Sequence, residues 1–566
     1  MQVIWGKVRQ YKTWILSVVL LALVAAGGTV YYQGKNAVPV AAGTTMTVVR
    51  GDIQSVVSAT GTISALNSVE ISSRVTGLLT DVKVKENDMV KAGQVLAVLD
   101  DTTLKAQVAQ YRSQLENYAT IYERSKKLAA IGGQSIQQLD GALAQANGVA
   151  RRLPYQTNDE IRKQINSGKI QYIDMHLSHV AQQSRYGFLG GKVDVAIVEA
   201  VAITEEGHII PSTSLGNAAS FIQSADIVIV EVNTSQPLEL EGMHDVYIPL
   251  DPPHRLPIPL VKADDRIGTP YIPCGFDKIT YIVPCDLPDA VRPLAPIDED
   301  AKAMSGHLIE FFQQEIKQGR LPKNLLPLQS GVGSVANAVV SGLVDSPFED
   351  LSVFTEVIQD GMFDLIDAGK LTFASGTSIT PSPDGLKRLY ANLAEYRKKI
   401  ILRPQEISNS PEIARRLGVI AMNTAIELDI YGHVNSTHIM GTKMMNGIGG
   451  SGDYARNAYL TVFCTNSVAK GGAISSIVPM VSHFDHTEHD THIFVTERGL
   501  ADVRGLSPKE RARVIIDKCA HPDYQPMLLD YLERAEKATS FAHTPHLLEE
   551  ALSWHTRFVQ TGTMKK

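Results

Sequence analysis

The residues best suited to covalent chemistry in this chain are one glutamate and two glycine-containing loops. Glu356 follows the loop at residues 329–333, and a second loop at residues 446–453 contains four glycines. A carboxylate can attack an acyl carbonyl, and backbone N–H groups can receive the charge that develops on the attacked oxygen. Glycine lets a backbone approach a ligand closely because it has no Cβ. The pattern predicts covalent acyl transfer, with Glu356 as the nucleophile.

Length and composition indicate a globular protein of several domains. The chain has 566 residues, of which 44% are hydrophobic, so there is ample material for buried cores. The net charge is −7 and the isoelectric point is near 6.2. No basic domain is present in the sequence, so we predict no nucleic-acid partner.

A metal site and a serine hydrolase are not favoured by the residues. Four histidines recur at every third position before a predicted strand, at His483, His486, His489 and His492. Side chains at this spacing do not share one face of a strand, so they are not expected to converge on a metal ion. The sequence also lacks the G-x-S-x-G turn that carries the nucleophile of many serine hydrolases. We therefore predict no metal.

The N-terminus has the pattern of a membrane anchor. Residues 13–34 carry no charge, and a spanning helix needs about 20 apolar residues. Lys7, Arg9 and Lys12 precede this stretch, which predicts a cytoplasmic N-terminus and places the remainder outside the cytoplasm. The alternative is a cleaved signal peptide, because small residues follow at 25–28.

The next segment combines strands with one helix. Apolar runs separated by turn residues predict strands within residues 46–100, including 47–49, 69–72 and 95–99. The helix that follows has apolar residues at spacings of three and four. This spacing fits a coiled-coil seam or the buried stripe of an ordinary amphipathic helix. The stripe consists of Leu104, Val108, Tyr111, Leu115, Tyr118 and Tyr122.

The order of these N-terminal features resembles a membrane fusion protein, a periplasmic adaptor of efflux pumps and secretion systems. The resemblance covers residues 1–145 and implies part of a lipoyl-like domain, one arm of an α-helical hairpin, and efflux proteins as partners. We accordingly predict an anchor at 1–35 and a partial adaptor segment at 36–146. The motifs that carry the resemblance are 50–53, 59–63, 73–77 and 90–96.

From about residue 147 the pattern changes to an α/β fold. Apolar runs of strand length at 193–200, 227–232, 473–478 and 492–495 alternate with helical segments, which predicts sheets buried on both faces. A proline-rich stretch at 250–297 is interpreted as a connection between two lobes. We predict one lobe at 147–295 and a second lobe with C-terminal helices at 296–566.

This second part resembles the acetyl-CoA hydrolase/transferase family of class I CoA-transferases. The resemblance implies transfer of CoA between an acyl-CoA and a carboxylic acid, with succinyl-CoA and acetate as the expected pair and acetyl-CoA hydrolysis as a side activity. It also implies that lobe one is truncated, because the adaptor segment replaces its first strand and a glycine-rich turn. The supporting strings are 328–333, 355–362, 408–411, 444–453, 469–472, 521–524 and 543–548.

The resemblance assigns roles to particular residues. Glu356 would be the nucleophile, and Gly449 and Gly450 would supply backbone donors near the oxyanion and the thioester. Asn409 would orient Glu356 or the acyl oxygen. Glu497 would contact residues that themselves contact the reacting groups. The residues expected to hold CoA are Leu328, Gln329, Ser330, Gly331, Val332, Gly333, Asn446 and Lys470.

The same resemblance implies no permanently bound cofactor, with CoA as both substrate and covalent intermediate. The expected partners are acyl-CoA, small carboxylic acids and a second copy in a homodimer. The enzyme part is expected in the cytoplasm, whereas the N-terminal segment predicts anchoring in the inner membrane. Two other functions remain open: a membrane-anchored adaptor with an inactive enzyme half, and a dedicated acetyl-CoA hydrolase in which water replaces the acceptor acid.

Overall fold

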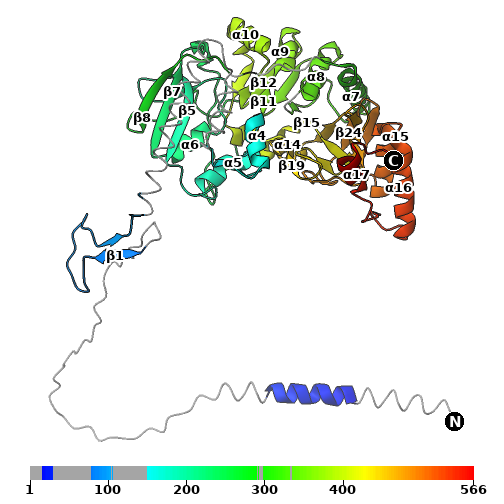
Figure 1. Cartoon of the computed structure of the whole chain (residues 1–566), viewed down its shortest axis with the longest axis horizontal. Helices are drawn as coiled ribbons and strands as arrows, with labels where there is room; N and C mark the ends of the chain where they lie inside the picture. Colours follow the sequence, from blue (N-terminus) through cyan, green and yellow to red (C-terminus); the bar gives the residue numbers. More distant parts are fainter. Residues whose placement is uncertain are drawn as a thin grey trace. The chain divides into compact units, whose positions relative to one another are not determined.

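The computed structural model describes residues 16–29, 78–102, 105, 149–289, 291, 297–331 and 334–566. The chain forms two compact units, Met1–Asp101 and Thr102–Lys566 (Figure 1). In the first unit, residues 16–29 are helical. A hairpin is also present there, in which β1 (Leu79–Val82) pairs antiparallel with β2 (Ala97–Leu99).

The predicted membrane anchor within residues 1–35 is not supported. Among the described residues, no helix has both the length and the apolar character that a membrane span requires.

The remaining N-terminal predictions are tested only in part. The strand expected at 95–99 is present as β2. The strands expected at 47–49 and 69–72 lie outside the described residues, as does the apolar stripe that begins at Leu104.

The second unit contains an eight-stranded sheet whose strands are parallel except for the last. Its first strand in the chain, β9, lies in the middle. The chain then adds strands on one side, in the order β10, β12 and β14, and afterwards on the other side, from β15 to β25. The strands are β14 (Ile400–Leu402), β12 (Leu371–Gly376), β10 (Leu351–Phe354), β9 (Leu328–Ser330), β15 (Ile420–Thr424), β20 (Leu460–Cys464), β24 (Ile493–Thr496) and β25 (Gly499–Asp502).

Both faces of this sheet are buried, which explains why its strands are apolar without alternation. In β20, Val462 belongs to the core under α7 and α8, whereas the next residue, Phe463, belongs to a second core under the C-terminal helices. Neighbouring residues point to opposite faces of a strand, so alternate apolar residues pack into the two cores on the two faces of the sheet. Figure 1 shows α15 and α16 beside the C-terminal end of this unit.

A second, four-stranded sheet lies in the first lobe. Its order is β6 (Ile209–Pro211), β5 (Val195–Ile203), β7 (Ile227–Asn233) and β8 (Ile279–Cys285). The predicted strands at 193–200 and 227–232 are thereby confirmed. The expectation that 250–297 is only a connection is wrong, because β8 lies within it and pairs with β7. Pro284 and the prolines around this strand obscured its pattern in the sequence.

The remaining elements are short strands and flanking helices. The apolar run at 473–478 forms two short strands rather than one. The short strands are β3 (Arg151–Arg152), β4 (Gln171–Tyr172), β11 (Val357–Ile358), β13 (Ser378–Ile379), β16 (Glu427–Asp429), β17 (Val434–Asn435), β18 (His438–Ile439), β19 (Lys443–Met444), β21 (Val468–Ala469), β22 (Ile474–Ser475) and β23 (Ile477–Val478).

Helix ends follow local capping rules. Asn158 caps α4 through its side chain, and Ser507 with Glu510 forms a capping box on α15. The helices are α4 (Asp159–Asn166), α5 (Leu177–Arg185), α6 (Ala218–Ser224), α7 (Glu299–Lys317), α8 (Ser334–Gly342), α9 (Asp360–Asp367), α10 (Pro383–Ala391), α11 (Leu393–Tyr396), α12 (Gln405–Ser408), α13 (Pro411–Leu417), α14 (Ser451–Ala455), α15 (Pro508–Cys519), α16 (Gln525–Ala538) and α17 (Ser553–Thr561).

Candidate active site

Glu356 lies where the eight-stranded sheet reverses its direction of growth. It follows β10, which pairs with β9, and β9 pairs on its other side with β15. Open parallel sheets bind ligands at such a point, outside the carboxyl ends of the strands. The ends of β9 and β10 are tied together there, because the Thr355 hydroxyl donates to the Ser330 carbonyl at 3.1 Å and accepts from the Ser330 N–H at 3.3 Å. The sheet therefore places Glu356 rigidly at its expected ligand edge.

A small cavity of about 70 Å³ surrounds the Glu356 side chain. Its wall combines the ends of three neighbouring strands with the second glycine loop. The lining residues are Tyr155, Gln329, Ser330, Gly331, Glu356, Asn423, Thr424, Ser436, Asn446, Gly447, Ile448, Gly449, Gly450 and Ser451. The structure thus brings together the nucleophile and most of the loop residues that the sequence predicted.

Two donors hold the Glu356 carboxylate. The Asn409 side-chain amide donates to Glu356 Oε2 at 3.3 Å, and the backbone N–H of Gly450 donates to the same carboxylate. Burial raises the pKa of Glu356 to about 7, and the two hydrogen bonds limit this rise because they favour the charged form. Near neutral pH a substantial fraction of Glu356 is therefore a desolvated, oriented carboxylate, which is a competent nucleophile.

Glycine is required at position 450. A Cβ there would lie 2.2 Å from Asn409 Nδ2 and 2.4 Å from Glu356 Oε2, which is closer than atoms can approach. The preceding residue, Gly449, has a φ of +60° and passes beside the Tyr155 ring. The backbone of the loop therefore contacts the reacting carboxylate directly, and only glycine permits that approach.

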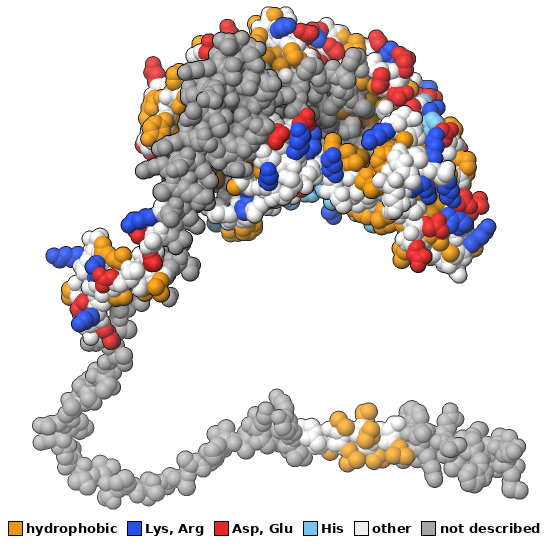
Figure 2. Space-filling model, in the orientation of Figure 1, with side chains coloured by type: hydrophobic (Ala, Val, Ile, Leu, Met, Phe, Trp, Pro, Cys, Tyr) orange, Lys and Arg blue, Asp and Glu red, His pale blue; other side chains and the backbone are white. Residues whose placement is uncertain are grey.

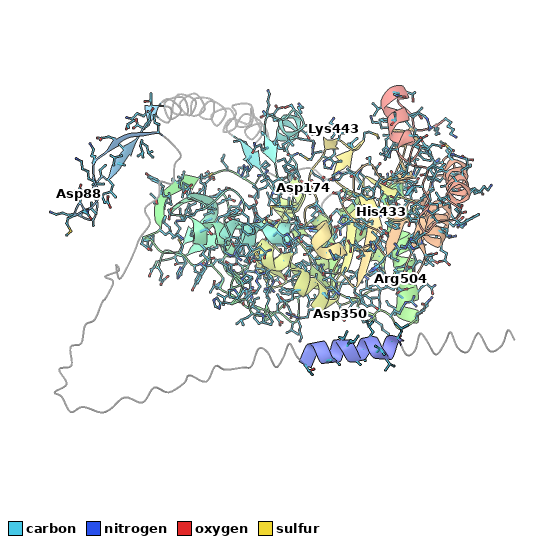
Figure 3. All side chains as sticks on the ribbon, turned by 90° about the horizontal axis from the view of Figure 1, so that it is seen from below. Asp88, Asp174, Asp350, His433, Lys443 and Arg504 are labelled. Atoms are coloured by element: carbon cyan, nitrogen blue, oxygen red, sulfur yellow. The ribbon has the colours of Figure 1, made fainter. Side chains whose placement is uncertain are left out.

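The first lobe fixes this glycine loop from the other side. Tyr172 donates its hydroxyl to the Asn446 carbonyl at 2.6 Å, and Asn446 donates its side-chain amide to the Tyr155 hydroxyl at 3.1 Å. Asp174 accepts the Ile448 N–H at 2.9 Å. Figure 3 shows Asp174 in the middle of this unit, where cyan and yellow segments meet.

Burial also changes the titration of the groups around the cavity. It raises the pKa of Tyr155, with a further contribution from the nearby Glu356 charge. It raises the pKa of Asp174 to about 6, although the hydrogen bond from Ile448 opposes this rise. Tyr155 is thus a neutral phenol facing the cavity.

The first glycine loop also lines this cavity, through Gln329, Ser330 and Gly331. Gln329 and Asn423 exchange two side-chain amide hydrogen bonds, at 3.2 and 3.1 Å, and this pair joins β9 to β15. Gly331 donates its N–H to the Met422 carbonyl at 2.8 Å. Leu328 is buried in the core and supports the strand rather than the cavity. The predicted residues Val332 and Gly333 lie outside the described residues.

A larger cavity of about 720 Å³ lies beside the first, and Thr424 lines both. Its volume falls in the range of small-molecule sites, roughly 300–1,000 Å³. Lys470 and Lys565 line it, and Lys565 binds Asp523 at 2.6 Å. Lys470 is therefore placed in the larger cavity and not beside Glu356.

Glu497 is separated from the nucleophile. Its carboxylate accepts the Ser467 N–H at 2.8 Å and also the Ser467 hydroxyl. It lines neither cavity among the described residues. Glu497 therefore supports the strand end next to Asn466, which does line the larger cavity.

The four histidines singled out in the sequence have separate partners. His486 contacts the Ser451 hydroxyl at 3.0 Å, whereas His492 accepts the Thr461 N–H at 3.2 Å. Within the described ranges, no group of His, Cys, Asp or Glu side chains is arranged to hold a metal ion.

Several residues of the site were not identified from the sequence. Tyr155 and Tyr172 come from the first lobe, and Asn423, Thr424 and Asp453 come from the second. Asp453 was visible at the end of the second glycine loop, but nothing in its spacing indicated its hydrogen bonds with Ser178 of the first lobe. The others approach Glu356 only through tertiary contacts between distant segments.

Comparisons with known proteins give one consistent result. The N-terminal domain of the acetyl-CoA hydrolase/transferase family matches residues 83–284, and its C-terminal domain matches residues 385–532. The chain is 56% identical over 478 residues to the succinyl-CoA:acetate CoA-transferase of Clostridium kluyveri, covering 84% of this chain and 88% of that protein. It is 49% identical over 434 residues to the acetyl-CoA hydrolase of Schizosaccharomyces pombe, covering 75% and 83% respectively.

Solved structures show the same type of fold. RipA from Yersinia pestis matches with a TM-score of 0.52 and 23% identity, over 68% of this chain and 79% of that one. A 4-hydroxybutyrate CoA-transferase from Porphyromonas gingivalis matches with a TM-score of 0.50 and 20% identity, over 69% and 89%. At these identities the likeness concerns the fold alone.

These matches correct one sequence-based interpretation. The N-terminal family domain begins at residue 83, which lies within the segment 36–146 assigned to a membrane fusion protein. The adaptor resemblance, its membrane anchoring and its efflux partners are therefore not supported.

Proposed function

The chain belongs to the acetyl-CoA hydrolase/transferase family, and on that premise we propose that it exchanges CoA between succinyl-CoA and acetate through a glutamyl-CoA thioester on Glu356. The observation that supports this most is the environment of Glu356. Its carboxylate is desolvated at the ligand edge of a parallel sheet and is held by Asn409 and the Gly450 N–H. The 56% identity to a succinyl-CoA:acetate CoA-transferase supports the choice of substrates.

The reaction balances without a metal or a nucleotide. A Glu356 oxygen attacks the thioester carbonyl carbon, the C–S bond breaks, and CoA leaves as a thiolate. The thiolate then attacks the glutamyl carbonyl of the resulting anhydride. The first acid leaves as a carboxylate, and a glutamyl-CoA thioester remains. A second carboxylate repeats these steps in reverse. One carboxylate replaces another on CoA, so no further energy source is required.

The backbone of the glycine loop would stabilise this chemistry. In each step a carbonyl oxygen gains negative charge, and a fixed N–H at that position lowers the barrier. The Gly450 N–H already faces the carboxylate, and Asn409 faces Glu356 Oε2. We propose these two groups as the donors, with Gly449 shaping the loop.

The larger cavity is proposed to hold the body of CoA. It meets the Glu356 cavity at Thr424, and Lys470 and Lys565 supply positive charge for phosphate groups. A cytoplasmic location and a homodimer, both expected from the family resemblance, are part of this proposal.

An acceptor assay tests the proposal against simple hydrolysis. Purified protein is incubated with succinyl-CoA, with and without acetate, and the CoA species are separated chromatographically. We expect acetyl-CoA to form only with acetate, at a rate far above the loss of succinyl-CoA without it. Equal rates of free CoA release in both samples would instead indicate a hydrolase. Glu356→Gln should abolish either activity.

A further inference from the structure

Tyr155 contributes a phenol to the wall of the Glu356 cavity. It lies in the first lobe, in the segment between β3 and α4. A phenol hydroxyl can both donate and accept a hydrogen bond, and it is neutral near pH 7 because its ordinary pKa is about 10. It can therefore donate its proton to a bound anion without adding a charge to the cavity.

The side chain of Asn446 determines which of these two roles the hydroxyl fills within the protein. Asn446 Oδ1 accepts the Gly447 N–H at 2.8 Å, so Nδ2 is turned toward Tyr155 and donates to its hydroxyl oxygen at 3.1 Å. The hydroxyl thus serves Asn446 as an acceptor. Among the described residues, no side chain or carbonyl accepts its proton in return. That proton remains available to a ligand in the cavity.

The described lining of this cavity contains no positively charged side chain. Glu356 is the one charged residue in it, and the others are glycine, tyrosine, isoleucine and neutral polar residues. A carboxylate bound here must therefore be held by neutral donors. The charge of Glu356 would repel it, but this charge is lost when Glu356 is joined to CoA as a thioester. The acceptor acid is thus expected to enter at that stage.

We propose that Tyr155 is a catalytic residue that binds the acceptor acid, by donating its hydroxyl proton to one carboxylate oxygen of acetate while the other oxygen attacks the glutamyl thioester. The attack forms a C–O bond to the glutamyl carbonyl carbon, the C–S bond breaks, and CoA leaves as a thiolate. The proton stays on Tyr155. Because the cavity measures only about 70 Å³, an acid that contacts Tyr155 also lies close to Glu356. This inference rests on the proposed function.

Discharge of the Glu356 thioester by acetate tests this role. The wild type and Tyr155→Phe are loaded with succinyl-CoA to the same thioester content, freed of small molecules and mixed with acetate. Mass spectrometry of the intact protein then follows the loss of the thioester. We expect Tyr155→Phe to react about 10- to 100-fold more slowly, as is typical when a hydrogen bond to a charged group is lost. An equal rate in both proteins would overturn the inference.

Hydroxylamine separates binding of the acid from general damage to the site. This small neutral nucleophile also cleaves thioesters, but it has no carboxylate for Tyr155 to hold. Tyr155→Phe should therefore be discharged by hydroxylamine at the wild-type rate. Equal slowing with both reagents, or a folded variant that cannot be loaded, would show that Tyr155 acts on the thioester itself. Either result would overturn the inference.

Tyr390→Phe is the matched control. The Tyr390 hydroxyl is also partly buried and donates to Gln236 Oε1 at 2.7 Å, but Tyr390 is absent from the described lining of both cavities. Its loss should leave discharge by acetate unchanged, and thermal unfolding checks that both Phe variants are folded. Equal slowing of this control would contradict a role specific to Tyr155.

The experiment also distinguishes this inference from the proposed function. If the wild type forms no thioester on Glu356, the glutamyl mechanism fails. If the thioester forms and Tyr155→Phe discharges it normally, only the role of Tyr155 fails.

Discussion

At the level of single residues, the site depends on a carboxylate that is largely shielded from solvent yet still able to ionise. Burial alone would keep Glu356 protonated, and the hydrogen bonds from Asn409 and Gly450 restore part of its acidity. A nucleophile is useful when it is ionised near the working pH and little solvated. The opposing effects of burial and hydrogen bonding produce this condition.

The pH dependence of the reaction should report this carboxylate. We expect kcat/KM in the free enzyme to fall as the pH drops through about 7, because protonated Glu356 cannot attack. Asn409→Ala removes a hydrogen bond that favours the charged form of Glu356. The fall of kcat/KM should therefore occur at a higher pH in this variant. Both profiles can be measured with succinyl-CoA at subsaturating concentration. If kcat/KM of the wild type fell only near pH 4.5, the ordinary pKa of glutamate, this would contradict the environment of Glu356 described here.

The same pKa shift has a consequence for stability. The folded protein raises the pKa of Glu356 from 4.5 to about 7, so folding favours its neutral form. The associated stability is present below the unfolded value and is lost as the pH rises through about 7. Glu356→Gln, which stays neutral, should therefore melt at a higher temperature than the wild type at pH 8.

That difference should shrink toward pH 4.5, where wild-type Glu356 is neutral in the folded state. Thermal unfolding at both pH values provides the comparison. If the Glu356→Gln variant were less stable than the wild type at pH 8, ionised Glu356 would not destabilise the folded protein.

Sequence reasoning found the central residues and missed those that approach from elsewhere in the chain. Glu356, Asn409 and Gly450 were identified because they lie in motifs of their own. Tyr155 and Asp453 were not, since their roles arise from contacts between lobes. Lys470 was expected to hold CoA and Glu497 to support the site indirectly. The structure places Lys470 in the larger cavity and Glu497 beside it.

At the level of secondary-structure elements, the strands that were predicted well are the long ones in the middle of a sheet. β5 and β7 are parallel neighbours with a regular register, and their apolar runs mark them. β8 was missed because prolines interrupt its segment. The two-residue strands, such as β22 and β23, carry too few residues for any periodicity to show.

The two lobes are joined by a fully buried ion pair. Arg403, just after β14, binds Asp245 of the first lobe, and its other nitrogens donate to Ser375 Oγ at 2.8 Å and to the Ala263 carbonyl at 3.1 Å. Both members of the pair are shielded from water. Removing one member would leave the other charge buried alone.

Arg403→Leu should therefore lower the free energy of unfolding by about 3–5 kcal/mol. The matched control is Arg388→Leu, because Arg388 binds Asp364 and Asp367 at the partly exposed surface of α9 and α10. That control should cost only about 0–1 kcal/mol. Urea denaturation of both variants tests the difference, and similar losses would contradict the importance of the buried pair.

At the level of the whole molecule, the described residues cover only one face of the four-stranded sheet. Ala196, Val198 and Val230 are buried under α6, but Ile197 and Tyr281 on the other face are 69% and 61% exposed. The register places these exposed positions on one side of β5, β7 and β8. Figure 2 shows hydrophobic side chains at the edge of the unit where β8 lies. Parallel sheets are ordinarily buried on both faces.

An exposed apolar surface of this kind should bind a hydrophobic dye. We expect the native protein to enhance the fluorescence of anilinonaphthalene sulfonate, and the double change Ile197→Thr with Tyr281→Thr to reduce this signal substantially. Activity should be retained, since this face lies away from the residues that line the Glu356 cavity. An unchanged signal in a folded double variant would mean that this face does not form the exposed patch.

The family and its chemistry were recognisable from the sequence because motifs for the nucleophile, both glycine loops and the C-terminal region occur in order. The N-terminal segment was misassigned because a few short motifs and an uncharged stretch determined that interpretation. The match of the enzyme family from residue 83 does not support it. Short motifs without a described core around them are weak evidence for a domain.

The most direct test of the account is mass spectrometry of the peptide that contains Glu356, after the protein has been incubated with succinyl-CoA. The account predicts a CoA thioester on Glu356 that disappears when acetate is added, with acetyl-CoA as the product. Glu356→Gln should carry no such adduct. Turnover of succinyl-CoA by folded protein without any adduct on Glu356, even after rapid quenching, would contradict the glutamyl mechanism.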